Sequence, residues 1–381
     1  MSVFLGSNQI GSVNLTQLQN INTDLEDSLI NRTITSYNNE ILNIRQFAFA
    51  SCSKLTSVNF PKCNSIGSSA FEYCIGLTSI SFPNCNYIGS WAFDQCNNLT
   101  TISFPACVSI GSNAFYNCIN LTSVDFPNCS YIGNWGFSYC IKLITINFPN
   151  CISIGISAFA NCKSLSTANF PNCTSIENSA FYNCRSLSNI SFPNCTAIGS
   201  WAFYSCYSLS NVSFSNCTVV GSSAFYSCRS LFSVFFSNCN YIGDNAFNGC
   251  SSLTTVSFPN CNNMGITVFS GCHLISVFFP ICYSVNNYAF RNCSFLTTAS
   301  FPSCSYIGTS AFYGCYNLLS LYLLGSSIPY LTTDAFTSTP ISNYTTSTGG
   351  VYGSIYVPAS LYNNYLAATN WSVYSARIVS V

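Results

Sequence analysis

The chain has 381 residues, of which only 5% are charged, and its ten Lys and Arg balance its ten Asp and Glu. A neutral chain this poor in charge lacks the long-range attraction that draws proteins to nucleic acid, so we expect no nucleic-acid partner. No apolar run approaches the roughly 20 residues of a membrane-spanning helix, so we also expect no membrane insertion.

Residues 1–43 lie outside the internal repeat that fills most of the chain. Their opening lacks a basic region followed by a continuous apolar stretch, so no signal peptide is evident. The apolar spacing in residues 14–30 allows a short amphipathic helix. We interpret residues 1–43 either as a cap over the first edge of the repeat stack or as a segment that attaches the chain to a larger assembly.

Residues 44–323 repeat a 22-residue unit with the consensus C-x-x-L-T-S-V-x-F-P-x-C-x-x-I-G-x-x-A-F-x-x. Its first cysteine recurs from Cys52 to Cys315 at a step of 22 residues, except for a step of 21 between Cys272 and Cys293. All 25 cysteines fall on the two cysteine positions of the unit. A unit this small can bury its apolar face only against its neighbours, so the period predicts a solenoid of about 12 units.

Within one unit, the segment LTSVNF at 55–60 predicts a strand, because Val58 and Phe60 alternate with the polar Asn59. The proline that follows cannot donate to a strand ladder and ends the strand. The segment SSAFEY at 68–73 predicts one short helical turn with a serine as its cap. Stacked units would then form a parallel β-sheet on one face and short helical turns on the other, capped at both ends.

From residue 324 the repeat decays, and we interpret residues 324–381 as a C-terminal cap. Residues 355–358 predict a last strand, and Ser360 is placed to cap a helix that leads to Trp371. This segment would cover the end of the hydrophobic stack, which would otherwise be exposed.

The motif L-x-x-I-x-[LF]-P followed by I-G-x-x-A-F-x-x-C resembles the BspA-like type of leucine-rich repeat over about residues 44–323. The closing run YVPASLYNNYLAATNW is similar to the end of many such proteins. This resemblance implies a surface-exposed adhesion or ligand-binding protein of bacteria, of some protozoa or of gut-associated phages. The opening LGSNQIGSVNL also resembles the starts of some phage tail and fibre proteins.

No residue pattern predicts catalysis, a cofactor or a metal site. A zinc site needs converging ligands, whereas the cysteines form two separate columns, which we interpret as buried thiols, with disulfides between units as the alternative. His273, the only histidine, follows Cys272 without a residue to orient it, and the missing residue there predicts a local kink or a tighter turn. Glu72 and Asp94 share a column that we expect to be exposed, which argues against a glycosidase pair.

Binding residues are expected where the copies differ. On the outward side of the strands, small polar residues give way to Phe235, Phe278 and Tyr322, with Phe232 nearby. This change predicts an aromatic recognition patch. The alternative is that these rings pack on one another or on a loop.

The position after the first cysteine carries Lys163, Arg185 and Arg229, which would line one edge of the stack. These side chains would meet an anionic glycan or an acidic partner, or they are simply solvated. A further column contains the tryptophans Trp91, Trp135 and Trp201. Such rings suit carbohydrate stacking or protein contact, or they form the outer layer of the core.

These features favour a non-catalytic adhesion or recognition protein that binds a host-surface glycan or protein. Without an evident signal peptide, we expect it on a virion, as a fibre or decoration protein, with residues 1–43 contacting other virion proteins. One alternative is a bacterial or protozoan cell-surface adhesin. Another is a purely structural assembly protein.

Overall fold

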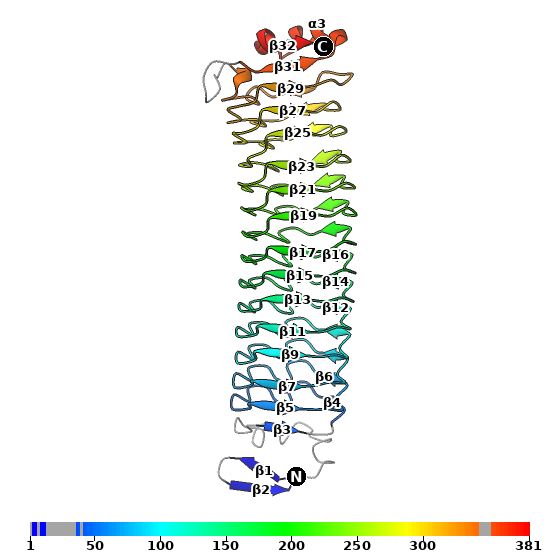
Figure 1. Cartoon of the computed structure of the whole chain (residues 1–381), viewed down its shortest axis with the longest axis vertical. Coiled ribbons are helices and arrows are strands. Elements are labelled where there is room, and N and C mark those ends of the chain that lie inside the picture. Colours follow the sequence, from blue (N-terminus) through cyan, green and yellow to red (C-terminus); the bar gives the residue numbers. More distant parts are fainter. Residues whose placement is uncertain (1, 6–7, 13–35, 39–40, 343–351) are drawn as a thin grey trace. The chain divides into compact units, whose positions relative to one another are not determined.

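The computed structural model describes residues 2–5, 8–12, 36–38, 41–342 and 352–381. The chain falls into two compact units, Met1–Cys173 with Asn183–Leu187, and Thr174–Tyr182 with Ser188–Val381. Both units are parallel-strand solenoids, and together the described residues contain about 15 turns (Figure 1). The predicted leucine-rich-repeat solenoid is confirmed, with a few more turns than the 12 units expected.

In the first unit, most turns carry one three-residue and one two-residue strand. The three-residue strands are β3 (Ser36–Asn38), β5 (Ser57–Asn59), β7 (Ser79–Ser81), β9 (Thr101–Ser103), β11 (Ser123–Asp125), β13 (Thr145–Asn147) and β15 (Thr167–Asn169). The two-residue strands are β4 (Asn43–Ile44), β6 (Ser65–Ile66), β8 (Tyr87–Ile88), β10 (Ser109–Ile110), β12 (Tyr131–Ile132) and β14 (Ser153–Ile154). Strands β1 (Ser2–Leu5) and β2 (Asn8–Ser12) form an antiparallel pair. The helix expected in residues 14–30 lies outside the described residues.

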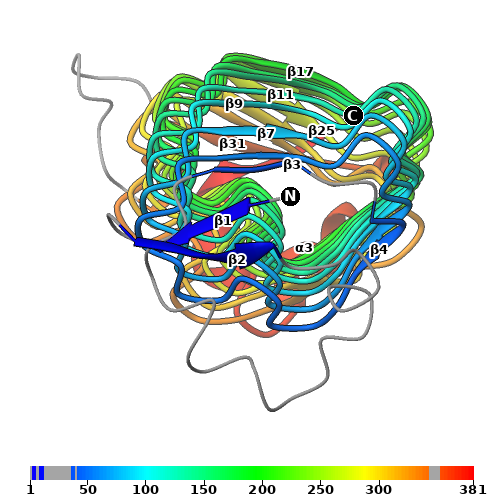
Figure 2. The same ribbon diagram turned by 90° about the horizontal axis from the view of Figure 1, so that it is seen from below.

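The two kinds of strand form separate parallel ladders in which each residue pairs with its copy one repeat away, as Ile110 does with Ile132. Figure 2 shows β4 on a different side of the turn from β7 and β9. The sequence predicted only the three-residue ladder, because a two-residue strand is too short to leave an alternating pattern.

The second unit repeats this arrangement. Its longer strands are β17 (Asn189–Ser191), β19 (Asn211–Ser213), β21 (Ser233–Phe235), β23 (Thr255–Ser257), β25 (Ser276–Phe278), β27 (Thr298–Ser300), β29 (Ser320–Tyr322), β31 (Ser354–Val357) and β32 (Ile378–Ser380). Its two-residue strands are β16 (Ser175–Ile176), β18 (Ala197–Ile198), β20 (Val219–Val220), β22 (Tyr241–Ile242), β24 (Asn263–Met264), β26 (Ser284–Val285), β28 (Tyr306–Ile307) and β30 (Tyr330–Leu331).

Both ladders of the second unit are interrupted at the 21-residue repeat, between β23 and β25 and between β24 and β26. In the preceding repeat, the Leu253 amide donates to the Cys250 carbonyl oxygen at 3.0 Å and closes a turn. The short repeat lacks one residue between Cys272 and Leu274, so the same turn cannot form there. Among the described residues the two-residue ladder is interrupted only here, which is the local distortion expected at this repeat, whereas the longer ladder is also interrupted between β17 and β19.

The segment 68–73, for which the sequence predicted a helical turn, consists of consecutive hydrogen-bonded turns instead. Ser69 and Tyr73 have φ values of 54° and 59°, in the left-handed region that a right-handed helix excludes. This backbone points alternate amides toward the next repeat, where the Phe71 amide donates to the Ala92 carbonyl oxygen at 2.8 Å. The prediction was wrong because the repeat satisfies these amides between turns and not within one turn.

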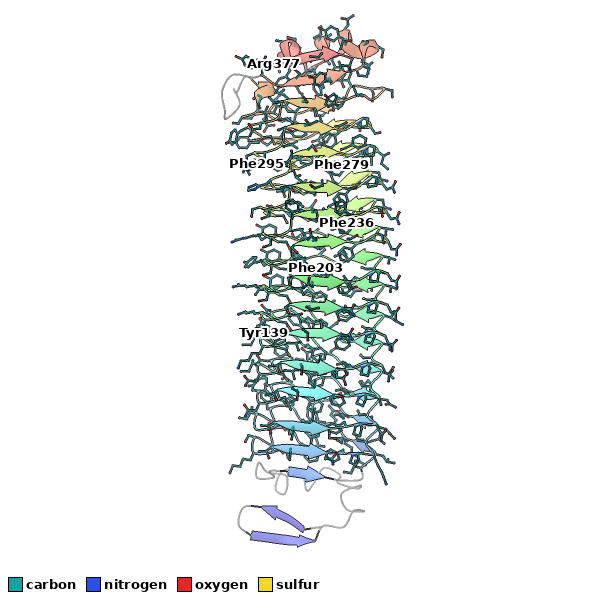
Figure 3. All side chains as sticks on the ribbon, in the orientation of Figure 1. Tyr139, Phe203, Phe236, Phe279, Phe295 and Arg377 are labelled. Atoms are coloured by element: carbon teal, nitrogen blue, oxygen red, sulfur yellow. The ribbon has the colours of Figure 1, made fainter. Side chains whose placement is uncertain are left out.

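Stacked phenylalanine rings form the core of each unit. Along one column, the Phe71 and Phe93 rings lie 5.1 Å apart and almost parallel, and along the other column Phe82 and Phe104 lie 5.6 Å apart. Rings of the two columns meet edge to face, as Phe93 and Phe104 do at 6.0 Å. Figure 3 marks Phe236 and Phe279 of the second unit, and both are buried in the same way.

Glycine allows the turns to approach this closely. A Cβ atom on Gly111 would lie 2.5 Å from the backbone nitrogen of Ser90 in the preceding turn, which is shorter than any tolerable contact. A side chain here would push the two turns apart and open the phenylalanine columns.

The C-terminal segment packs on the last turns of the second unit. After β31, it forms the 3₁₀ turn η2 (Ala359–Leu361), helix α3 (Tyr362–Ala367), the 3₁₀ helix η3 (Ser372–Arg377) and finally β32, and an earlier 3₁₀ turn, η1, spans Pro340–Ser342. The buried Trp371 indole donates to the Pro329 carbonyl oxygen at 2.8 Å and lies against Phe336. Ser360 does not cap α3, because it lies within η2 and α3 has no side-chain cap.

All 25 cysteines are buried free thiols. In the first column, the thiols from Cys74 onward donate to a phenylalanine carbonyl oxygen of the preceding turn, as Cys118 does to Phe93 at 3.1 Å. In the second column, the thiol donates two residues ahead, as Cys107 does to Ser109 at 3.4 Å. Burial raises the pKa of the Cys107 thiol to about 12, which suppresses the reactive thiolate.

We therefore expect the native chain to react only slowly with iodoacetamide at neutral pH, because the thiols are buried and burial raises the pKa of most of them, as it does for Cys107. After unfolding without a reductant, mass spectrometry should count alkyl groups on all 25 cysteines. The same labelling after reduction serves as the control. A lower count in the unreduced sample would mean that disulfides join the turns.

Candidate functional site

Three phenylalanines of the predicted patch are exposed on the strand face of the second unit. Phe232 precedes β21, Phe235 ends β21 and Phe278 ends β25, and their exposed fractions are 54%, 48% and 61%. No ring contact involves any of the three within the described residues. The exposure of Phe235 and Phe278 follows from the strand alternation, which buries Val234 and Val277 and turns these flanking residues outward.

Tyr322, the fourth aromatic residue of the predicted patch, has a different environment. It ends β29 and is half-buried, and its ring stacks on that of Tyr356 at 4.6 Å. The alternative interpretation, that a patch ring packs on a neighbour, therefore applies to Tyr322. Its partner Tyr356 lies in β31, beyond the repeat, where the 22-residue period gave no register.

The surroundings of the exposed phenylalanines are polar but uncharged. Between β21 and β25, the turn with β23 presents Thr254, Thr255 and Ser257. No strand from β19 to β29 of this ladder contains a charged residue. The face thus offers apolar rings and hydroxyl groups, a combination that suits a neutral ligand with both flat apolar faces and hydrogen-bonding groups.

The predicted basic residues are exposed, and two of them are held by neighbours. Lys163 and Arg185 belong to the first unit, where the Arg185 Nε donates to the Asn183 Oδ1 at 2.7 Å. Arg229 belongs to the second unit, and its guanidinium lies 5.0 Å from the centre of the Tyr207 ring. A single basic edge through all three residues therefore stays a prediction.

The tryptophan column is exposed and does not form an outer layer of the core. Trp91 and Trp135 of the first unit are 42% and 40% exposed, and Trp201 of the second unit is 47% exposed. All three have φ between 56° and 61°, in the left-handed region. Sequence reasoning placed them in one column but could not show this backbone conformation.

Asp94 is buried, which corrects the expectation that it and Glu72 are exposed. It is 2% exposed, and its Oδ1 has no hydrogen-bond partner among the described residues. Burial, and then the charge of Glu72 one turn away, raise the pKa of Asp94 to about 7, and Gln95 offsets part of this. The sequence did hold a signal for this difference. The repeat position of Asp94 is occupied in the next two turns by the uncharged residues Tyr116 and Ser138.

Within the described ranges, no group of three or more His, Cys, Asp or Glu side chains could hold a metal ion. In the same part of the chain, no helix is both long and apolar enough to cross a bilayer. His273 is exposed, and its ring lies 4.7 Å from that of Phe295.

Replacing Asp94 with asparagine should stabilise the chain at alkaline pH. Because the pKa of Asp94 in the folded chain is about 7, above its ordinary value near 4, its contribution to stability is fully present below about pH 4 and is lost as pH rises through 7. We expect Asp94→Asn to raise the thermal midpoint at pH 8, by the equivalent of roughly 1–3 kcal/mol, and to change it little at pH 4.

The matched control for this substitution is Asp125→Asn, which removes an exposed acid from β11 of the same unit. It should produce no such rise at pH 8. Equal thermal midpoints for wild type and Asp94→Asn at pH 8 would show that the buried carboxylate costs the fold nothing.

Comparison with known proteins places this repeat in a family. Residues 22–143, 130–250 and 220–342 match the sequence profile of the BspA type leucine rich repeat region (6 copies). No curated protein is detectably similar in sequence.

Solved structures of two bacterial leucine-rich repeat proteins are similar to this chain, and the first of them supports the fold. A leucine-rich repeat protein from Bacteroides ovatus is 24% identical over 78% of this chain and 91% of that one, with a TM-score of 0.58. A leucine rich cell surface protein from Faecalibacterium prausnitzii is 23% identical over 77% of this chain and 88% of that one, with a TM-score of 0.40. The structural likeness supports the fold alone, whereas the profile matches together span most of the chain. The chain therefore belongs to the BspA-type leucine-rich repeat family.

Proposed function

We propose that the chain is a non-catalytic recognition protein that binds a host-surface glycan or protein through the strand face of its second unit. The observation that carries this proposal is the exposure of Phe232, Phe235 and Phe278, with Ile275, on a face whose other strand residues are small and polar. Apolar rings exposed in water at one place are typical of binding surfaces. Family membership supports the same general role, since leucine-rich repeat solenoids serve as interaction platforms.

The low charge of the chain constrains the partner. The strand face has no charged residue from β19 to β29, so binding there depends on ring stacking and on hydrogen bonds to hydroxyl groups. The exposed basic side chains Lys163, Arg185 and Arg229 lie on other positions of the turns and would add contacts to an acidic partner.

Display on a particle is the second part of the proposal. The solenoid would project from a virion as a fibre or decoration protein, attached through residues 1–43 and closed at its other end by residues 324–381. The alternatives are a bacterial or protozoan cell-surface adhesin, and an assembly protein that binds no outside partner.

Replacing Phe235 or Phe278 with serine should weaken binding on a glycan array or to host cells by at least about tenfold, because each substitution removes an exposed anchor. Serine occupies the same strand position in β19 and β23, so the fold should tolerate it. The matched control is Phe295→Ser, which removes a ring that is 52% exposed and outside the strands. Unchanged binding by Phe235→Ser and Phe278→Ser would remove the strand face from the binding site.

Location is tested by quantitative proteomics on purified particles and on cell envelopes. The virion proposal expects the full chain in particles, and it expects a chain lacking residues 1–43 to be missing from them while its circular dichroism stays that of the solenoid. Enrichment in cell envelopes would favour the adhesin. A chain present in particles that binds neither cells nor glycans would favour the assembly protein.

A further inference from the structure

Trp91 and Trp135 occupy a position where the fold does not require a large side chain. The same position in neighbouring turns of the first unit carries Ser69, Asn113 and Ser157, all with positive φ. Asparagine and serine adopt this backbone more readily than a bulky ring, for which it is an outlier. Both tryptophans are also exposed, so burial of apolar surface does not explain them. Strained and exposed side chains of this kind mark functional positions.

The two tryptophans lie two turns apart on the same side of the first unit, with Asn113 on the turn between them. The Trp91 amide donates to Ser112 at 2.9 Å and the Asn113 amide donates to Asn134 at 2.8 Å, which fixes these residues on successive turns.

The spacing between the turns sets the distance between the backbone positions of Trp91 and Trp135. The buried rings of Phe93, Phe115 and Phe137 on these turns are 5.2 and 5.1 Å apart. The backbones of Trp91 and Trp135 are therefore about 10 Å apart, twice the ladder spacing. Carbon atoms in contact lie about 3.5–4.0 Å apart, so two indoles that project in parallel from these positions, beyond the shorter Asn113 side chain, would leave room for one further ring.

Polar side chains lie on the turn between Trp91 and Trp135. Asn113 is half-exposed, and among the described residues its hydrogen bonds are made by its backbone, whose amide donates to the Asn134 carbonyl oxygen. Tyr116, beside it on the same turn, places its ring 6.4 Å from Trp91 and 5.6 Å from Tyr139. The surface between the two tryptophans therefore combines aromatic rings with the amide group of Asn113.

The charge of these turns selects the ligand. Residues 74–139 contain no Lys or Arg, whereas Asp94 and Asp125 lie within them and Glu72 directly before them. An anionic ligand would meet only acidic groups here, and an aromatic ligand would leave the amide of Asn113 without a partner. A sugar ring without charge has flat C–H faces for the indoles and hydroxyl groups for the amide.

We propose that Trp91 and Trp135 form a binding site for an uncharged saccharide, with one sugar ring between the two indoles and its hydroxyl groups hydrogen-bonded to Asn113. This site belongs to the first unit and uses none of the strand-face phenylalanines. It therefore does not rest on the function proposed for the second unit.

The test is isothermal titration calorimetry of the full chain with four neutral probes, maltohexaose, cellohexaose, mannohexaose and chitohexaose, and with polygalacturonate as an anionic probe. We expect a neutral probe to bind with a dissociation constant of about 1 mM or tighter and the anionic probe not to bind. Trp91→Ser and Trp135→Ser should each weaken binding at least about tenfold. Serine is native to this position in other turns, so both variants should keep the thermal midpoint of the wild type.

Trp201→Ser is the matched control. Trp201 has the same backbone conformation and the same exposure, but the residue two turns further, Asn245, is not aromatic. It should leave the affinity unchanged. The proposal is overturned if no neutral probe binds, or if Trp201→Ser weakens binding as much as Trp91→Ser does. It is also overturned if Phe235→Ser abolishes binding while Trp91→Ser does not, a result that would support the strand-face site instead.

Discussion

The stacking of phenylalanine on phenylalanine at about 5 Å is the constraint on which the rest of each unit depends. Strand ladders fix the rise of one turn near 4.8 Å, and flat rings fill that rise without a gap. Every other residue of the core must therefore also fit above its own copy. Glycine at Gly111 lets the backbones approach, and the small thiols of the cysteine columns fill what remains while donating to carbonyl oxygens. The charge-poor composition follows, because a column of identical charges at this spacing would repel itself.

The repeated part of the sequence predicted the fold because one period determines the register of every turn. What it could not predict was the path of the backbone between the strands. The helical turn expected at 68–73 assumed right-handed residues, whereas Ser69 and Tyr73 are left-handed. Asp94 lies between the left-handed Trp91 and Gln95, and it is buried although an exposed acid was expected. The residue pattern does not report torsion angles, so it could not predict the backbone path of these turns.

For the candidate binding residues too, the sequence predicted exposure in the strands but not between them. Phe235 and Phe278 are exposed as predicted, since a strand alternates its side chains and the buried valines beside them fix the direction. Tyr322 obeys the same alternation, yet it is covered by Tyr356, which joins the ladder from a segment beyond the period. The segments between the strands have no alternating pattern of buried and exposed residues. The exposure of Trp91 and Trp135 could therefore be learned only from the structure.

The 21-residue repeat shows which side of the turn can change. Both ladders are interrupted there, and the Phe258 and Phe279 rings are 6.2 Å apart, compared with 5.3 Å for Phe236 and Phe258. On the turn side the hydrogen bonds continue across the same step, and the Phe269 amide still donates to Ala289 at 2.8 Å. The hydrogen bonds between the non-strand segments are therefore kept at this step, whereas the strand pairing is lost. One interruption of the longer ladder lies between β21, which presents Phe235, and β25, which presents Phe278.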